Sequence, residues 1–148
     1  MKIALGADHA GYLLKDHIRQ YVAERGHEVI DEGTNAADSV DYPDFALKVA
    51  GHVAARRAEC GILVCGSGIG MAITANKVPG IRAANISSQY EAQMSRAHND
   101  LNVLTLGARI LDEAGATQIV QIWLETQFSA GRHSGRLDKI HEIEKARA

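Results

Sequence analysis

The sequence predicts an α/β protein in which helices cover both faces of one mostly parallel, five-stranded sheet. Five short apolar runs alternate with segments that have the 3.6-residue period of helices. The runs lack polar alternation, as expected for strands that are buried on both faces. A chain of 148 residues is the size of one domain, and no repeat or linker divides it. We therefore expect a single domain over residues 1–148.

The expected strands cover residues 3–6, 28–31, 61–65, 82–86 and 102–106, and the helices between them cover residues 12–24, 45–57, 69–77, 88–96 and 112–124. In the first helix the charged side chains, Lys15 among them, lie opposite an apolar face that includes Leu13. Gly26 is a helix stop, and Asp112 places an acid at the start of the fifth helix.

The end of the chain departs from this alternation. Residues 129–136 are polar and rich in glycine, which indicates a loop, and a charged helix over residues 137–148 follows. This extra C-terminal helix has little apolar surface to bury on its own domain, so we expect it to cover a neighbouring subunit.

Composition and charge exclude several classes of protein. Hydrophobic residues make up 46% and charged residues 23%, which excludes a disordered chain, and the net charge of -2 disfavours nucleic-acid binding. No window approaches the roughly 20 apolar residues of a membrane span, and no signal peptide is apparent. Cys60 and Cys65 would lie about 16 Å apart on opposite faces of one strand, so they cannot pair. Free thiols without an export signal predict a cytoplasmic protein.

Polar side chains follow three of the expected strands. Asp8 and His9 follow the first strand, the segment from Cys65 to Gly70 follows the third, and Arg109 follows the fifth. Ligands of open parallel sheets bind at this carboxyl edge. Asp8 can also cap a helix and His9 can be a packing residue, but their pairing at this edge favours ligand contacts.

A glycine-rich turn leads from the third strand into a helix. Gly66, Gly68 and Gly70 allow several backbone N–H groups to converge on an anion or oxyanion, although a tight turn needs the same small residues. Their spacing is neither that of a dinucleotide-binding loop nor that of a P-loop. Cys65 adjoins these amides, which favour a thiolate able to act as base or nucleophile. The alternative, a small buried apolar residue, is the default for Cys60.

Two more polar groups lie later in the chain. His98 and Asn99 close the fourth helix just before the fifth strand, either as ligand contacts or as part of a helix C-terminal cap. Arg132 and Arg136 would be one turn apart in a helix, where they could grip a phosphate or form a solvated charge cluster. No histidine or cysteine pair has metal-ligand spacing, so we expect no metal.

Taken together, these segments make the sequence similar to the ribose-5-phosphate isomerase B family, which also includes galactose-6-phosphate and allose-6-phosphate isomerases. The similar segments span nearly the whole chain in the family's order. They are GADHAG at 6–11, DYP at 41–43, CGSGIG at 65–70, ANKVPGIRA at 75–83, RAHND at 96–100, GRH at 131–133, and Arg136.

The resemblance implies a three-layer Rossmann-like sandwich that holds no nucleotide. It also implies a homodimer or a dimer of dimers with the sites at the subunit interface. Cys65 would be the base that moves a proton between C1 and C2 of the open-chain sugar. Ser67, with the amides of the loop at Gly66 and Gly70, would steady the enediolate. Met71 stands where another branch of the family carries Glu, so the resemblance is to the cysteine-base branch.

The remaining roles come from the same resemblance. His98 would open the furanose ring, with Asp8 and Tyr42 near it. Asn99 would contact the developing oxyanion. The phosphate contacts would be His9, Arg109, Arg132 and Arg136.

The expected activity is the interconversion of D-ribose 5-phosphate and D-ribulose 5-phosphate, which needs a base and oxyanion donors but no cofactor. An isomerase of allose 6-phosphate or galactose 6-phosphate is the nearest alternative, because pocket length decides between them. A non-catalytic nucleotide-binding module would bind ATP or NAD and tolerate loss of Cys65. A thiol redox protein would need a second nearby cysteine, whereas Cys60 faces away.

Overall fold

Five strands form one sheet in the computed structural model, which describes residues 1–147. They are β1 (Lys2–Ala7), β2 (Glu28–Asp31), β3 (Cys60–Cys65), β4 (Ala83–Asn85) and β5 (Val103–Gly107). Their order is β2-β1-β3-β5-β4, and every neighbouring pair is parallel. The register pairs Ala7 with Val64 and Cys65 with Gly107, so the carboxyl ends of three central strands meet at one edge. The predicted fold class is confirmed, with a sheet that is parallel throughout.

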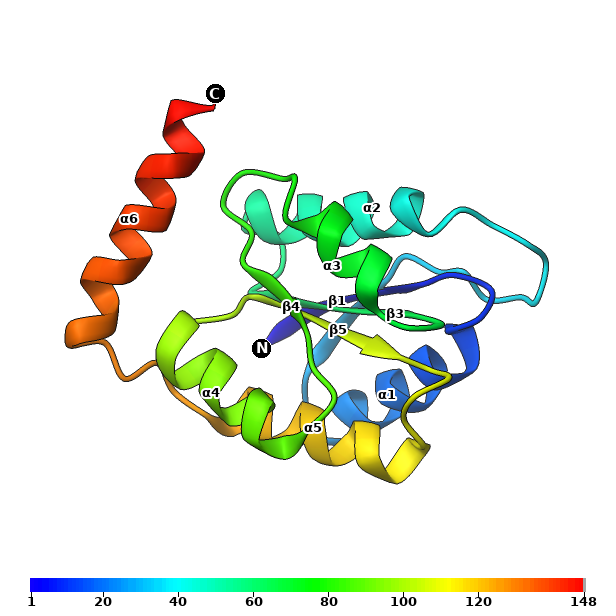
Figure 1. The fold of residues 1–148 in the computed structure, drawn as a ribbon. Coiled ribbons are helices and arrows are strands. Elements are labelled where there is room, and N and C mark those ends of the chain that lie inside the picture. The colour runs from blue at the N-terminus through cyan, green and yellow to red at the C-terminus, as the bar shows by residue number, and fades with distance from the viewer. Residues whose placement is uncertain (148) are drawn as a thin grey trace.

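Helices cover both faces of the sheet (Figure 1). One face carries α1 (Tyr12–Glu24), α4 (Gln89–Asn99) and α5 (Glu113–Glu125), and the other carries α2 (Tyr42–Ala54) and α3 (Ile69–Ala75). The strand order requires this division, because right-handed crossovers in opposite directions along a sheet put their helices on opposite faces. A last helix, α6 (Arg132–Ala146), lies outside these layers beside the end of α4.

Each face of the sheet has its own buried core. Cys60, Ile62 and Val64 of β3 belong to the core under α1, α4 and α5, whereas Leu63 and Cys65 belong to the core under α2 and α3. The two cysteines therefore lie on opposite faces, as the strand period predicts. Burial raises the pKa of the Cys60 thiol to about 12, as expected for a packing residue.

Several predicted helix ends are confirmed by their capping contacts. Asp112 Oδ1 accepts a hydrogen bond from Gly115 N–H at 2.7 Å at the start of α5. Ser88 Oγ accepts one from Glu91 N–H at 3.2 Å at the start of α4. Gly26, with a φ of +86°, lies just after the end of α1.

Several helix boundaries differ from the prediction, among them the end of α2 at Ala54, three residues before the expected one. α2 begins at Tyr42, three residues earlier than expected, because Pro43 occupies its first turn, where a missing N–H costs nothing. α4 runs on to Asn99. α6 begins at Arg132, so most of the expected loop over 129–136 is helical. Leu137 and the residue one turn before it are both buried, and this packed face outweighs the unfavourable glycine between them.

The prediction of which side chains of α1 are buried was wrong at two positions. Lys15 is fully buried and Leu13 is 69% exposed, the reverse of the expectation. The Lys15 Nζ donates to Asp31 Oδ1 at 2.7 Å and to Asn35 Oδ1 at 2.8 Å. A buried ammonium is tolerated when it is paired and hydrogen-bonded. Both partners come from the segment at the end of β2 and after it, so the period of α1 could not reveal them.

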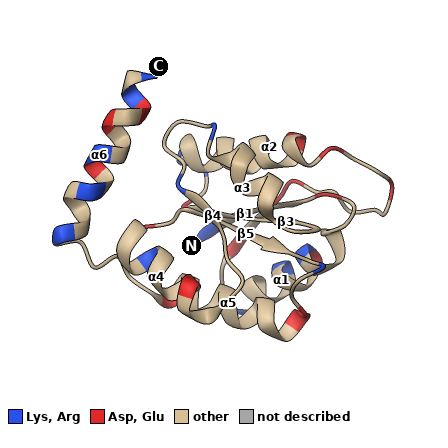
Figure 2. Cartoon of the chain, in the orientation of Figure 1, with Lys and Arg blue, Asp and Glu red and all other residues tan. Residues whose placement is uncertain are grey.

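Helix α6 buries little of its surface on the rest of the chain. Its buried residues are His133 and Leu137, while Ile140 and Ile143 are 47% and 61% exposed. Figure 2 shows basic and acidic residues along its whole length. Among residues 1–147, none of the helices combines the length and apolar character that crossing a bilayer requires.

Candidate active site

The Sγ atom of Cys65 lies at the end of β3, where the chain turns into α3. Gly68 N–H donates to this sulfur at 3.1 Å, and Gly68 takes a left-handed φ of +83°. The turn is held by Asn85 Nδ2, which donates to Ser67 O at 3.0 Å, and by Thr105 Oγ1, which donates to Gly68 O at 2.9 Å. A donor directed at the sulfur stabilises negative charge on it. The donor is an amide of the turn, because Gly68 lies just before α3 begins at Ile69.

Two glycines of this turn make room for other site residues. A Cβ added to Gly66 would lie 3.0 Å from Arg109 Nη1, and one added to Gly70 would overlap the Tyr42 ring. Arg109 N–H also donates to Gly66 O at 3.0 Å. Glycine here lets a guanidinium and a phenol approach the backbone closely. The structure thus brings Arg109 and Tyr42 to the Cys65 turn.

Asp8 and His9 lie at the same edge, after β1. Asp8 Oδ1 accepts hydrogen bonds from Ala10 N–H at 3.0 Å and Gly11 N–H at 3.1 Å. Asp8 therefore stabilises its own turn, but it is not the N-cap of α1, because that position is occupied by Gly11. His9 Nδ1 accepts a hydrogen bond from Val40 N–H at 3.2 Å, so a neutral His9 ring carries its proton on Nε2 and can donate it to a ligand.

A cavity of about 220 Å³ opens at the turn that follows Cys65. Ser67 lines it, and the Ser67 Oγ accepts a hydrogen bond from Ile69 N–H at 3.2 Å. Cys65 is 5% exposed and is not among the residues that line the cavity. The other lining residues are Ile69, Asn85, Ile86, Ser87, Gly107, Ile110 and Leu111.

A second polar group forms where α4 ends and α6 begins. The rings of His98 and His133 stack with centroids 4.1 Å apart and planes 16° from parallel. Burial, together with the positive charges of His98, Arg132 and Arg136, lowers the pKa of His133. A concentration of guanidinium and imidazole groups of this kind suits a phosphate.

The two groups lie at opposite edges of the sheet. Cys65 pairs with Gly107, the last residue of β5, whereas His98 and Asn99 precede Val103, the first residue of β5. Five strand residues span roughly 13 Å, so the structure does not bring the two groups together within one chain. The sequence already indicated this separation. Cys65 comes at the end of one predicted strand and His98 before the start of another, and the starts and ends of parallel strands lie at opposite edges of a sheet.

Two residues at the second edge have contacts that the sequence analysis did not assign. His133 stacks on His98, and Arg82 donates to the backbone of Asn99 and Asp100. Arg82 lies in segment 75–83 and His133 in segment 131–133, both of which are similar to the family. That similarity could have identified the two residues as candidates. Within residues 1–147, no three His, Cys, Asp or Glu side chains are arranged to hold a metal ion.

The fold and these side chains define a class of protein. It is a three-layer α/β protein with polar residues at the ends of its central strands, and its glycine turn lacks the dinucleotide-binding spacing. Within that class, the chain belongs to the Ribose/Galactose Isomerase family, whose model matches residues 3–140.

Individual relatives agree with this assignment. The chain is 48% identical over 146 residues to ribose-5-phosphate isomerase B of Escherichia coli, covering 99% of this chain and 98% of that protein. A solved structure of ribose-5-phosphate isomerase B from Clostridium thermocellum has a TM-score of 0.99 and 52% identity over 100% of both chains. The Mycoplasma genitalium ribose-5-phosphate isomerase B with bound ribulose 5-phosphate has a TM-score of 0.94 and 38% identity, over 97% and 96% of the two chains. The family resemblance is confirmed.

Proposed function

We propose that this protein is an aldose–ketose isomerase that interconverts D-ribose 5-phosphate and D-ribulose 5-phosphate without a cofactor. The observation that carries the proposal is the hydrogen bond from Gly68 N–H to Cys65 Sγ at 3.1 Å, in the same turn as Ser67, which lines the cavity. Family membership and the relatives named ribose-5-phosphate isomerase B support the same substrate.

In this proposal the Cys65 thiolate removes the proton from C2 of the open-chain aldose. The electrons left behind form a C1–C2 double bond, and the C1 oxygen becomes negative. Ser67 and the amides of the turn, with Asn99, stabilise this enediolate. Return of the proton to C1, with the hydroxyl proton passing from O2 to O1, gives the ketose. Atoms and electrons balance, so no redox cofactor takes part.

The other predicted residues serve the rest of the sugar phosphate. His98 opens the furanose ring, with Asp8 and Tyr42 near the ring. Holding the remote phosphate fixes C1 and C2 against the base, which converts binding energy into orientation. The proposed phosphate contacts are His9, Arg109, Arg132 and Arg136.

We also propose that each site is completed by a second copy of the chain. The Cys65 group and the His98 group lie at opposite edges of the sheet, so one chain cannot present both to one small sugar. A partner of opposite orientation, as in a twofold dimer, can supply the missing group to each site. The exposed Ile140 and Ile143 of α6 support such a contact. A homodimer or a dimer of dimers satisfies this requirement.

A substrate panel tests the function. The purified protein, with EDTA present, is given ribose 5-phosphate, allose 6-phosphate and galactose 6-phosphate, and ketose formation is measured. We expect ribose 5-phosphate to have the highest kcat/KM, with no effect of EDTA. Faster turnover of a six-carbon phosphate would move the assignment to that sugar. No ketose from any of them, with tight binding of ATP or NAD, would favour the nucleotide-binding alternative.

The proposed location is the cytoplasm, because Cys60 and Cys65 are both free and face opposite sides of β3. Cell fractionation with an antibody against the protein tests this, and recovery in an exported fraction would contradict it.

A further inference from the structure

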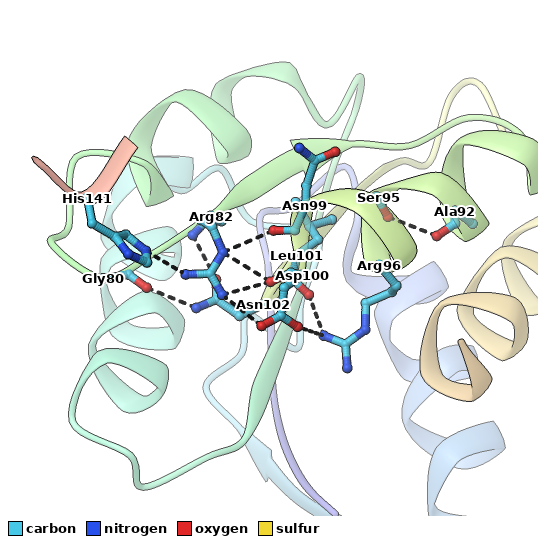
Figure 3. Close-up of polar contacts among 10 residues, drawn as sticks. All are labelled: Gly80, Arg82, Ala92, Ser95, Arg96, Asn99, Asp100, Leu101, Asn102 and His141. Carbon is cyan, nitrogen blue, oxygen red and sulfur yellow. Dashed lines mark hydrogen bonds and ion pairs between the residues drawn. The ribbon is translucent and has the colours of Figure 1, made fainter. Parts of the chain in front are cut away.

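Arg82 lies between three elements, just before β4, at the end of α4 and against α6 (Figure 3). Its Nε donates to Asn99 O at 3.1 Å, and its Nη2 donates to Asp100 O at 2.8 Å and contacts Asp100 Oδ2 at 3.4 Å. Its Nη1 donates to His141 Nε2 of α6 at 3.2 Å. One guanidinium therefore joins the turn after α4 to a helix about 40 residues later in the chain.

The segment that carries Arg82 is itself held by Asn102, the residue just before β5. Asn102 Oδ1 accepts the Arg82 N–H at 2.7 Å, and Asn102 Nδ2 donates to Gly80 O at 2.9 Å. Gly80 N–H in turn donates to Glu144 Oε1 of α6 at 3.0 Å. Residues 80–82 thus present two fixed attachment points, one for His141 and one for Glu144.

Helix α6 has few other attachments to its own chain. Only its first half is buried, at His133 and Leu137. Further along, Ile140 and Ile143 are largely exposed, and the polar contacts to residues 80–82 hold this part of the helix. A helix held near both ends has a defined direction, whereas a helix held only at its start can pivot.

We propose that Arg82 is a positioning residue for the second edge of the site. It fixes the end of α4 that carries His98 and Asn99, because it binds the backbone carbonyls of Asn99 and Asp100. Through His141 it also fixes the direction of α6, the helix that carries Arg132 and Arg136. This inference rests on the proposed function, which makes those residues contacts of the sugar phosphate. In Figure 3 the Asn99 side chain is directed away from Arg82, so the guanidinium holds the backbone and leaves that amide to the substrate.

A simple helix cap would not need the whole arrangement. Arg96 O and Ser95 O, near the end of α4, already have partners in Asp100 N–H and Leu101 N–H, and Arg82 takes the carbonyls beyond them, Asn99 O and Asp100 O. A lysine would supply the positive charge that the helix end favours. The planar fork of arginine is required to reach the α4 turn and His141 at once.

The test uses His141 variants of the full-length protein. In His141→Ala the contact to Arg82 is lost, and in His141→Gln an amide oxygen can accept the same N–H. His17→Ala is the matched control, because His17 Nε2 bonds Thr117 Oγ1 between α1 and α5, away from the site. The measurements are hydrogen exchange of residues 132–146 and the kcat and KM for ribose 5-phosphate.

For His141→Ala we expect faster exchange in α6 and a KM raised about three- to tenfold, the range that the loss of one net hydrogen bond produces. The kcat should change less than about twofold, since the proton-transfer group is untouched. His141→Gln should restore both values, and His17→Ala should leave them unchanged.

Arg82→Lys tests the other arm of the contact. It should raise KM as His141→Ala does. It should also lower turnover of the cyclic sugar more than turnover of an open-chain analogue, because the end of α4 that carries His98 loses its contacts to the guanidinium as well. Unchanged α6 exchange and KM in His141→Ala would overturn the proposal, as would a fall in kcat with unchanged KM. If the wild-type protein forms no ketose, the proposed function fails, while hydrogen exchange still decides whether Arg82 holds α6.

Discussion

The two cysteines of β3 show how far neighbouring residues can differ in chemistry. Cys60 is sealed in the core under α1, α4 and α5, and burial raises the pKa of its thiol to about 12. Cys65 ends the strand on the opposite face and receives the Gly68 N–H. Both are small and mostly buried, so residue type and exposure do not separate them. The donor directed at sulfur does, and it makes Cys65 the candidate base.

Cys65→Ala should lower kcat by about 10²- to 10⁴-fold, the contribution of a positioned general base, while binding of the substrate phosphate stays close to wild type. Calorimetric titration with ribose 5-phosphate measures binding separately from turnover. Cys60→Ala is the control, which should keep the activity. Near-normal turnover of Cys65→Ala would show that the Cys65 thiol is not the base.

His98→Asn should impair the cyclic sugar more than an open-chain analogue that needs no ring opening. We expect the ratio of the two kcat/KM values to shift by about tenfold or more, as for the loss of a general acid–base group. Parallel kinetics on the two substrates measure this ratio. Equal losses on both would argue against a ring-opening role.

At the scale of elements, a charged contact ties α1 to the segment after β2. The Lys15 ammonium lies inside the protein and bonds Asp31 and Asn35, and Asp31 Oδ1 also accepts Gly33 N–H at 2.9 Å. If the Lys15 ammonium is removed, the Asp31 carboxylate stays partly buried without a positive charge beside it, which costs free energy. This segment leads to Val40, whose N–H holds the His9 ring, so the contact supports the site as well as the fold.

Lys15→Met, which keeps an unbranched side chain but removes the ammonium group, should therefore lower the free energy of unfolding by about 2 to 3 kcal/mol. Asp31 is one quarter exposed, which limits the loss. Urea unfolding gives the value, with Lys77→Met at an exposed position of the same chain as control. A loss no larger than that of the control would mean that the Lys15–Asp31 contact adds no stability.

At the scale of the whole molecule, the sheet separates the two halves of the proposed site. The Cys65 group lies at the carboxyl edge and the His98 group at the amino edge, which is the reason for our proposal that a second copy of the chain completes each site. Helix α6, which stands away from the layers in Figure 1, is the element available to cross to that copy.

Mixing the two impaired variants tests this arrangement. In a mixed dimer of Cys65→Ala and His98→Asn, one site has both substitutions and the other has neither. Random association should then restore about a quarter of the wild-type activity. The activity is measured after the variants are unfolded and refolded together, with each variant refolded alone as control. No recovery from dimers that have exchanged subunits would mean that each site lies within one chain.

Much of the fold could be predicted from local pattern. Apolar runs without alternation indicated all five strands, and capping residues such as Asp112 marked helix starts. The start of α6 was missed, because Gly135 and the polar residues around it resemble a loop in sequence. Burial of Lys15 was missed for a related reason, since its partners are not on its own helix.

The sequence by itself determined the order of the elements, the loop that carries Asp8 and His9, the strand end that carries Cys65, and membership of the family. These follow from the chemistry of residues close together in the chain. Only the tertiary structure decided that His98 stacks on His133 and that Arg82 joins α4 to α6. Such contacts depend on how strands and helices distant in sequence pack together, and local periodicity does not contain that information.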